Sequence, residues 1–367
     1  MMRFFDGFCA SARNLGRKGC AHRRRGRVQM KWCYPLGLLA VALAGLLPLV
    51  AADSAPVKIT VASDHLEFLA GTDLVGRYQF AAAPDTPLAK PYLWPLHGPG
   101  GVEMTRDWPM KKGTPGESTD HVHQKSVWFC HGDVIPDGLE IKNKPKGVDG
   151  IDFWSEGKGH GRIVCRQHGV PKSMDNHASI VTVNEWQAAD GRKVLDETRT
   201  IRLYDFGGTR LFVFNIDLYA SAMPIVFGDT KEGSFGVRIN DRITEKSGHG
   251  KLENAEGKTG MKNCWGYLSA WCDYSGTLGG KVVGLAILDH PSNPYPACWH
   301  SRDYGLMAAN PFGRAKSGFP AMKGRTDLVR LDKGAHLKLR YGLLIHPGDA
   351  KAGKVAEYFE RFVKLDG

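Results

Sequence analysis

The stretch STDHVHQKSVWFCHGD, residues 118–133, gathers three histidines and two aspartates around one short apolar run. Imidazole titrates near neutral pH and also ligates metals, so His121, His123 and His131 could act as general acids or bases or as metal ligands. In an extended segment the side chains of a His-x-His pair point the same way, about 7 Å apart. We therefore weigh three roles for His121 and His123: a divalent metal site holding Zn, Cu or Fe, a metal-free acid–base site, or a purely structural one.

Further histidines stand where apolar runs end, at 289–291 and 346–347, each followed by proline. Proline stops a strand ladder because it has no N–H, so these histidines should lie at the rim of a sheet, where loops build sites. Neighbouring strand residues point to opposite faces, so Asp289 and His290 should serve different contacts. His300, beside a tryptophan in NPYPACWHSRDYG, is the fifth candidate imidazole.

Aromatic, acidic and basic residues accompany these histidines in GVEMTRDWP, residues 101–109, and GVDGIDFWSEGKGHGR, residues 147–162. An indole beside carboxylates and a guanidinium suits a polyol, because the ring covers the apolar sugar face while the polar groups bind hydroxyls. We expect Trp154 to be exposed at a rim. The residues expected to shape a substrate pocket are Glu103, Arg106, Trp154, Glu156, Asp289 and Asn310.

Strands must position these residues, because strand patterns dominate the chain. VKITVA at 57–62 alternates apolar and polar residues, and SIVTVNEWQAADGRKVLDETRTIRLY reads as two strands joined across Asp190-Gly191. KVVGLAILD and LKLRYGLLI are further strands rich in β-branched and apolar residues. Strands that follow one another by hairpins predict an all-β, antiparallel β-sandwich with few helices.

One helix is expected, in GDAKAGKVAEYFERFVK at the C-terminus. Val355, Phe359, Phe362 and Val363 fall on one face at helical spacing. This helix should pack across the end of a sheet.

The N-terminal part differs from the rest. Residues 30–52 combine a basic start, a short apolar run and small residues up to Ala52, which predicts a signal peptide cleaved near Ala52 and an exported protein. Residues 1–29 are interpreted as an over-called upstream extension, and 53–367 as a single β-sandwich domain. The apolar run is short for a membrane span, which needs about 20 residues.

Charge and cysteines narrow the function classes. The formal net charge is +11, but residues 1–52 carry nine Lys or Arg and one Asp, so the remainder carries 11 − 8 = +3. A near-neutral chain without a basic block lacks the footprint of a nucleic-acid binder. There is no Walker loop or dinucleotide fingerprint, so we expect no nucleotide cofactor.

Five cysteines follow residue 52, and Cys264 and Cys272 could pair or remain free thiols.

Several motifs together resemble the PmoA-like family, whose members are often labelled methane oxygenase PmoA. They are DHVHQKSVWFCHGDV, GVDGIDFWSEG with GHGRIV, GLAILDHPSNPYPACWHSRDYGLMAANPFG and LRYGLLIHPGD. The resemblance spans about residues 57–365, with Val122 and Gln124 where familiar members have Pro and His. The membrane subunit that gives this label its name is built from transmembrane helices. After Asp53 no apolar stretch is long enough to span, so we treat the label as inherited by name.

These observations predict an exported protein similar in style to the galactose-mutarotase-like sandwich, acting on a sugar or oligosaccharide by histidine-based acid–base or metal-assisted chemistry. The alternatives are a metal-dependent oxygenase, as the family label implies, and a non-catalytic carbohydrate-binding protein. We expect His121, His123, His131, His290 and His300 to converge in one pocket. No nucleic-acid partner and no membrane span in the mature chain are expected.

Overall fold

The computed structural model describes residues 55–82, 88–174 and 176–365, all within one compact unit, Val50–Gly367. The predicted upstream extension and signal peptide lie outside the described residues. None of the helices in the described ranges has the length and apolar character needed to cross a membrane.

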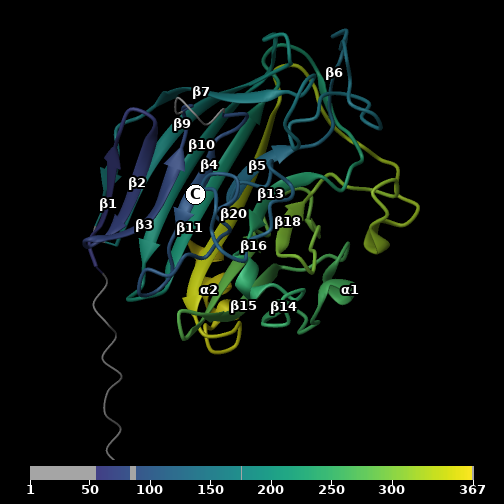
Figure 1. The fold of residues 1–367 in the computed structure, drawn as a ribbon. Helices are drawn as coiled ribbons and strands as arrows, with labels where there is room; N and C mark the ends of the chain where they lie inside the picture. The colour runs from purple at the N-terminus through teal and green to yellow at the C-terminus, as the bar shows by residue number, and fades with distance from the viewer. Residues whose placement is uncertain (1–54, 83–87, 175, 366–367) are drawn as a thin grey trace, which may run out of the picture. The chain divides into compact units, whose positions relative to one another are not determined.

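The first sheet has eight strands in the order β1-β2-β3-β4-β5-β13-β18-β17, and neighbouring strands are antiparallel (Figure 1). Consecutive strands at its N-terminal edge follow one another directly, as expected for a meander. Its strands are β1 Val57–Val61, β2 His65–Ala70, β3 Asp73–Gln79, β4 Tyr92–Leu96, β5 Val127–His131, β13 Gly233–Arg238, β18 Leu306–Asn310 and β17 Cys298–Trp299.

The second sheet has nine strands in the order β14-β15-β16-β20-β11-β10-β9-β7, with β8 paired to β9. Its strands are β14 Gly250–Asn254, β15 Trp271–Leu278, β16 Lys281–Asp289, β20 His336–Pro347, β11 Arg210–Tyr219, β10 Lys193–Asp205, β9 His177–Gln187, β7 Arg162–His168 and β8 Lys172–Ser173. A small third sheet joins β19 Val329–Leu331, β12 Ile225–Phe227 and β6 Val134–Pro136.

Aromatic side chains from the two large sheets meet between them and form the core. The ring centroids of Phe68 in β2 and Phe212 in β11 lie 5.2 Å apart, and those of Phe235 in β13 and Tyr341 in β20 lie 5.1 Å apart. All four side chains are buried, and burying each contributes about 1.5–3 kcal/mol. The antiparallel β-sandwich predicted from strand patterns is therefore confirmed.

Strand β5 separates the core from the candidate site. Its Phe129 faces the second sheet, where it meets Trp186 of β9 with ring centroids 6.1 Å apart. Side chains alternate along a strand, so Trp128 points to the opposite, outer face of the first sheet. The residues of the candidate site lie on that outer face, in the loops that cover it.

The turn and helix predictions are also confirmed. Strands β9 and β10 pair antiparallel across the turn at 190–191, where Gly191 has a φ of +86°. Helix α2, Val355–Lys364, buries Val355 and Phe362 against the second sheet. The other helices of the described residues are short: α1, Met261–Cys264, and two 3-10 turns, Asp241–Ile243 and Pro320–Met322. The five cysteines of the described residues are free thiols.

Candidate functional site

Two indoles on the outer face of the first sheet form the floor of the candidate site. The rings of Trp128 and Trp154 meet edge to face with centroids 5.1 Å apart, and His300 stacks on Trp154 at 6.3 Å. They fit because position 236 in β13 is glycine: a Cβ there would lie 2.7 Å from Trp128 and 3.2 Å from Trp154. Trp154 is fully buried, so the expectation that it is exposed at a rim is wrong.

A hydrogen-bonded Asp–His pair lies beside this floor. His121 Nδ1 is 3.1 Å from Asp120 Oδ2, and the two side chains are 39% and 45% exposed. The His121 ring stacks on Tyr304, with centroids 5.2 Å apart and planes 15° from parallel. The exposed imidazole is therefore held by a carboxylate at one nitrogen and by an aromatic ring on one face.

A tight turn brings the two histidines of the His-x-His pair together. The N–H of Gln124 donates to the carbonyl of His121 over 2.9 Å, and His121 has a φ of +42°. Residues other than glycine rarely adopt positive φ, and such residues cluster at functional sites. The spacing of about 7 Å considered for an extended His-x-His pair does not apply here, because the chain turns at His121. The turn still leaves the rings of His121 and His123 with centroids 5.7 Å apart.

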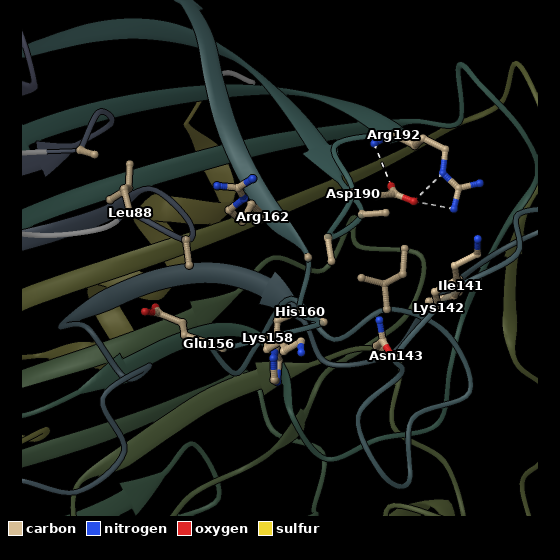
Figure 2. Close-up of a pocket in the computed structure, with 18 residues that line it drawn as sticks. Leu88, Ile141, Lys142, Asn143, Glu156, Lys158, His160, Arg162, Asp190 and Arg192 are labelled. Carbon is tan, nitrogen blue, oxygen red and sulfur yellow. Dashed lines mark hydrogen bonds and ion pairs between the residues drawn. The ribbon is translucent and has the colours of Figure 1, made fainter.

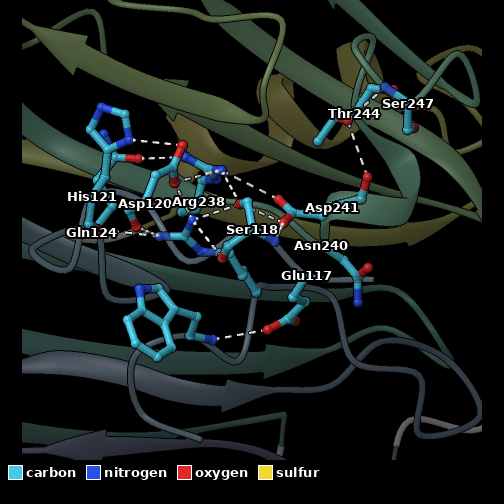
Figure 3. A network of polar contacts seen from close by, with 12 residues as sticks. Glu117, Ser118, Asp120, His121, Gln124, Arg238, Asn240, Asp241, Thr244 and Ser247 are labelled. Atoms are coloured by element: carbon cyan, nitrogen blue, oxygen red, sulfur yellow. Dashed lines mark hydrogen bonds and ion pairs between the residues drawn. The ribbon is translucent and has the colours of Figure 1, made fainter. Parts of the chain in front are cut away.

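The buried guanidiniums of Arg106 and Arg238 both contact Asp120, and Figure 3 shows Arg238 and Asp120 within this network. Arg106 Nη1 donates to Asp120 Oδ1 over 2.6 Å and to Ser118 Oγ over 2.9 Å. Arg238 Nη2 is 3.3 Å from the same Asp120 oxygen, and its Nη1 donates to Gln124 Oε1 over 2.9 Å. Burial opposes ionisation of Asp120, but the two guanidiniums outweigh it and lower its pKa to about 2. Asp120 therefore stays charged at any physiological pH.

The same network fixes the loop that carries Asp120. Asp241 accepts hydrogen bonds of 2.6 Å from both the backbone N–H and the hydroxyl of Ser118. Arg238 lies over the ring of Tyr304, with Cζ 4.6 Å from the centroid. Because Arg106 and Arg238 are almost completely buried, their desolvation cost must be offset by these contacts.

Glu103 lies at the edge of this network. Its side chain is 45% exposed, and one carboxylate oxygen is 3.9 Å from Lys111 Nζ. Its backbone carbonyl accepts a hydrogen bond of 3.0 Å from the Asn240 amide. Of the predicted pocket residues, Arg106 thus belongs to the centre of the network and Glu103 to its margin.

His123, the other imidazole of the pair, is held neutral. Burial lowers the pKa of His123 to about 4, and the positive charge of Lys90 acts in the same direction. Lys90 Nζ donates to the Trp154 carbonyl over 2.8 Å and lies 3.2 Å from Glu156 Oε1. Lys125 Nζ donates to Glu156 Oε2 over 2.7 Å. Glu156 therefore bridges two buried lysines next to His123.

His300 is the third imidazole of the cluster. It is buried, and its Nδ1 lies 3.9 Å from Glu232 Oε2. Burial lowers the pKa of His300 well below its usual value, and the charges of Arg302 and Lys231 add to this. A neutral imidazole can donate from one nitrogen and accept at the other, which suits a hydroxyl group. The negative charge of Glu232 also acts on His123, where it raises the pKa against the effect of burial.

The structure places His131 and Asn310 away from this cluster, in the core near the third sheet. His131 Nε2 is 2.8 Å from the Gly228 carbonyl oxygen, and its ring meets Phe312 edge to face at 4.9 Å. The Asn310 amide donates to the carbonyl of Thr230 over 2.9 Å. Both side chains are fully engaged in holding loops.

His290 and Asp289 lie on the second sheet, near helix α2. His290 Nδ1 is 2.7 Å from Ser292 Oγ, and its ring meets Phe362 edge to face at 5.1 Å. Asp289 accepts a hydrogen bond of 2.6 Å from the Asn293 amide. Burial raises the pKa of Asp289 to about 6. Of the five predicted imidazoles, the structure thus brings together His121, His123 and His300 only.

The fit of a metal ion to the histidine pair can be tested from the donor set. Within the described ranges, no group of three or more His, Cys, Asp or Glu side chains could hold a metal ion. His121 and His123 supply two imidazoles, while the Asp120 carboxylate is engaged by the guanidiniums and by His121. Two imidazoles do not make the set of three or four protein ligands that Zn takes, and no third His, Cys, Asp or Glu of the described residues completes a site for Cu or Fe.

Two of the hollows lined by described residues are large enough for a sugar ligand. One of about 750 Å³ includes Glu156 and His160 in its lining and adjoins the lysine-bridged carboxylate (Figure 2). The other, of about 590 Å³, lies on the second sheet and includes Asp217 and Lys338. None of the three clustered histidines is among the residues that line either hollow.

Sequence reasoning missed several residues of the cluster. Asp120 stands next to His121 in the first motif and Tyr304 stands in the RDYG motif, so adjacency could have indicated both. Lys90, Glu232 and Arg238 carry no local signal. Arg238 ends strand β13, while Lys90 and Glu232 stand just before strands β4 and β13, so segments far apart in the chain meet at the cluster.

The chain belongs to the family of unknown function DUF6807, whose family model matches residues 65–360. This corrects the resemblance stated above: the PmoA-like assignment is wrong, because the matching family is this one. The oxygenase alternative rested on that label and loses its basis. A comparison with curated protein sequences gave no match.

Among solved structures, the chain is similar to a galactose mutarotase-like protein from Clostridium acetobutylicum, with 10% identity, a TM-score of 0.38, and coverage of 80% of this chain and 99% of the other. Galactose 1-epimerase from Lactobacillus acidophilus shows 8% identity and a TM-score of 0.36, and the match covers 80% of this chain and 100% of the epimerase. The α-galactosidase from Lactobacillus brevis shows 8% sequence identity and a TM-score of 0.34, and the match covers 80% of this chain. Our chain spans only 40% of that enzyme's length.

Proposed function

We propose that this protein is an exported carbohydrate-active enzyme in which His121 transfers a proton to or from a sugar. The observation that carries the proposal is the series of contacts from buried Arg106 and Arg238 through Asp120 to an exposed imidazole. Groups with strongly perturbed pKa values that are coupled to specific partners mark candidate functional sites. The apolar run and small residues over 30–52 support export.

The geometry supports His121 as the general acid or base. A carboxylate that accepts the Nδ1 proton leaves Nε2 with a lone pair, which can take a proton from a C–H or O–H group and later return it. Asp120 acts here as a positioning residue, because it touches His121 and remains charged. Positive φ at His121 adds a strained backbone that the surrounding contacts must maintain.

The neighbouring groups suit a polyhydroxylated substrate. His123 and His300 are neutral at physiological pH and can each donate and accept one hydrogen bond. Glu232 supplies a carboxylate next to both rings. Proton transfer at a sugar carbon or hydroxyl underlies isomerisation, elimination and hydrolysis, and the proposal covers this class of reactions.

A second candidate is a non-catalytic carbohydrate-binding protein. It is favoured by the hollow of about 750 Å³, which has the size of a ligand pocket and whose lining does not include the three histidines. Such a protein would bind sugars through this hollow and leave them unchanged.

The test uses the full chain with a panel of neutral and acidic oligosaccharides in deuterated buffer, followed by proton NMR. We expect product formation or deuterium incorporation with the parent protein and a loss of about a hundredfold or more in His121→Ala. The matched control is His336→Ala, an exposed histidine on the second sheet that pairs with Asp217 at 2.8 Å. It should keep the parent rate.

Equal rates for the parent and His121→Ala would overturn the assignment of His121. Binding of sugars without any turnover or exchange by the parent protein would favour the non-catalytic candidate.

A further inference from the structure

The segment GKGHGR, residues 157–162, supplies three basic side chains to one hollow. Lys158, His160 and Arg162 alternate with glycines, and all three line the hollow of about 750 Å³ (Figure 2). The segment leads directly into strand β7, whose first residue is Arg162. Lys158 and Arg162 therefore bring two positive charges to the lining of the hollow.

Two of the glycines are required by close packing. Gly159 has a φ of +84°, and a Cβ there would lie 2.3 Å from the carbonyl oxygen of Asn143. A Cβ at Gly161 would lie 2.4 Å from the Phe153 ring. The segment is thus pressed against the loop at 141–143 on one side and the core on the other. This packing brings Lys142 to the same hollow.

The charges of the described residues around the hollow do not balance. The described residues that line it include four cations, Lys142, Lys158, Arg162 and Arg192, and two carboxylates, Glu156 and Asp190. Both carboxylates are already engaged, Asp190 by Arg192 at 2.7 Å and Glu156 by the two buried lysines. No carboxylate of the described residues lies within ion-pair distance of Lys142, Lys158 or Arg162.

The rest of the lining suits a sugar. Leu88, Ile141, Ile151 and Ala188 supply apolar walls, against which the C–H face of a pyranose can pack. His160 Nε2 is 3.4 Å from Asp152 Oδ2, while its Nδ1 is buried with no hydrogen-bond partner among the described residues.

We propose that this hollow binds an acidic oligosaccharide, with Lys158 and Arg162 pairing with its anionic groups. The inference rests on the proposed function and names its substrate class. Arg162 can pair with a planar carboxylate through two parallel N–H donors, which favours uronic acids, whereas sulfate esters carry a similar charge with a different shape. Glu156 lines the hollow and also pairs with Lys90, whose charge acts on His123.

The experiment measures binding by calorimetry to the full-length protein at low salt. The probes are tetragalacturonate, its fully methyl-esterified neutral form, a sulfated galactan tetrasaccharide and inorganic sulfate. The proteins are the parent, Lys158→Ala/Arg162→Ala, and the control Lys323→Ala/Lys333→Ala, which removes two exposed lysines outside the hollow.

We expect the parent and the control to bind tetragalacturonate at least tenfold more tightly than the neutral ester. We expect Lys158→Ala/Arg162→Ala to lose at least tenfold in affinity, because charged hydrogen bonds contribute that much. Tighter binding of the sulfated probe, with the same dependence on the double variant, would support the site and assign sulfate as the anion.

Equal binding of the neutral ester, an unchanged affinity in the double variant, or binding of inorganic sulfate as tight as that of the oligosaccharides would overturn the proposal. His121→Ala should bind tetragalacturonate as the parent does. Binding of tetragalacturonate by the parent protein without any turnover would count against the proposed chemistry while leaving the acidic-ligand site intact.

Discussion

Two exposed Asp–His–Tyr arrangements lie on different sheets of this protein. On the first sheet, His121 pairs with Asp120 at 3.1 Å and stacks on Tyr304 at 5.2 Å. On the second, His336 pairs with Asp217 at 2.8 Å and stacks on Tyr219 at 4.4 Å. Judged by these contacts alone, the two would be equally good candidates for an acid–base site.

They differ in what lies behind the carboxylate. Asp120 is held by the buried guanidiniums of Arg106 and Arg238, whereas no Lys or Arg of the described residues forms an ion pair with Asp217. Buried cations cost free energy, so a protein that keeps two of them behind an exposed carboxylate has fixed that carboxylate firmly. An exposed ion pair alone contributes only about 0–1 kcal/mol and is weakly positioned. The contacts that hold the carboxylate therefore distinguish the two arrangements better than the Asp–His contact does.

The largest expected effect is on activity. Asp120→Asn should lower kcat by about a hundredfold or more and leave KM nearly unchanged, because the orientation of His121 is lost while the substrate contacts remain. Asp217→Asn should behave as the parent. Steady-state kinetics over a range of substrate concentrations measures kcat and KM for both variants. A loss in Asp217→Asn equal to that in Asp120→Asn would remove the distinction between the two sheets.

The next effect is on stability. Asp120→Ala leaves two buried guanidiniums without their shared carboxylate and should lower the free energy of unfolding by about 1–3 kcal/mol. Asp217→Ala should cost less than about 1 kcal/mol, because its partner is exposed. Urea unfolding followed by tryptophan fluorescence measures both. Equal costs would mean that Arg106 and Arg238 do not depend on Asp120.

Acid should lower the free energy of unfolding through His123, the buried imidazole of the first sheet's cluster. Its folded pKa is about 4, below the ordinary value of 6.5, so the neutral ring stabilises the fold fully above pH 6.5. That contribution is lost as pH falls from 6.5 towards 4, at no more than about 1.4 kcal/mol per pH unit. His123→Gln should flatten the dependence of unfolding free energy on pH in this window. An unchanged slope in the variant would contradict the burial of a neutral ring.

The smallest effect concerns the aromatic support. Tyr304→Leu removes the ring under His121 and beside Arg238, and should lower kcat/KM about three- to tenfold, in line with about 0.5–1.5 kcal/mol for a stacked aromatic pair. Tyr219→Leu removes the equivalent ring under His336 and should leave kcat/KM unchanged. A parent-like rate for Tyr304→Leu would show that the guanidinium-held carboxylate suffices to orient His121.

Sequence patterns determined the fold class because strand alternation and turn chemistry are local. The Asp190-Gly191 turn, the β9–β10 hairpin and the amphipathic α2 each follow from residues close together in the chain. Local patterns also identified the His121–His123 segment as chemically rich, although its turn was missed because a hydrogen bond between residues 121 and 124 has no simple sequence signature.

Only the tertiary structure decided which imidazoles meet. His121, His123 and His300 share the outer face of the first sheet, while His131 fills the core and His290 packs on α2. Lys90, Glu232 and Arg238 join the site from segments far apart in the chain. The physical reason is that pairing and register between distant strands fix which side chains become neighbours, and no residue type or spacing along one segment encodes that choice.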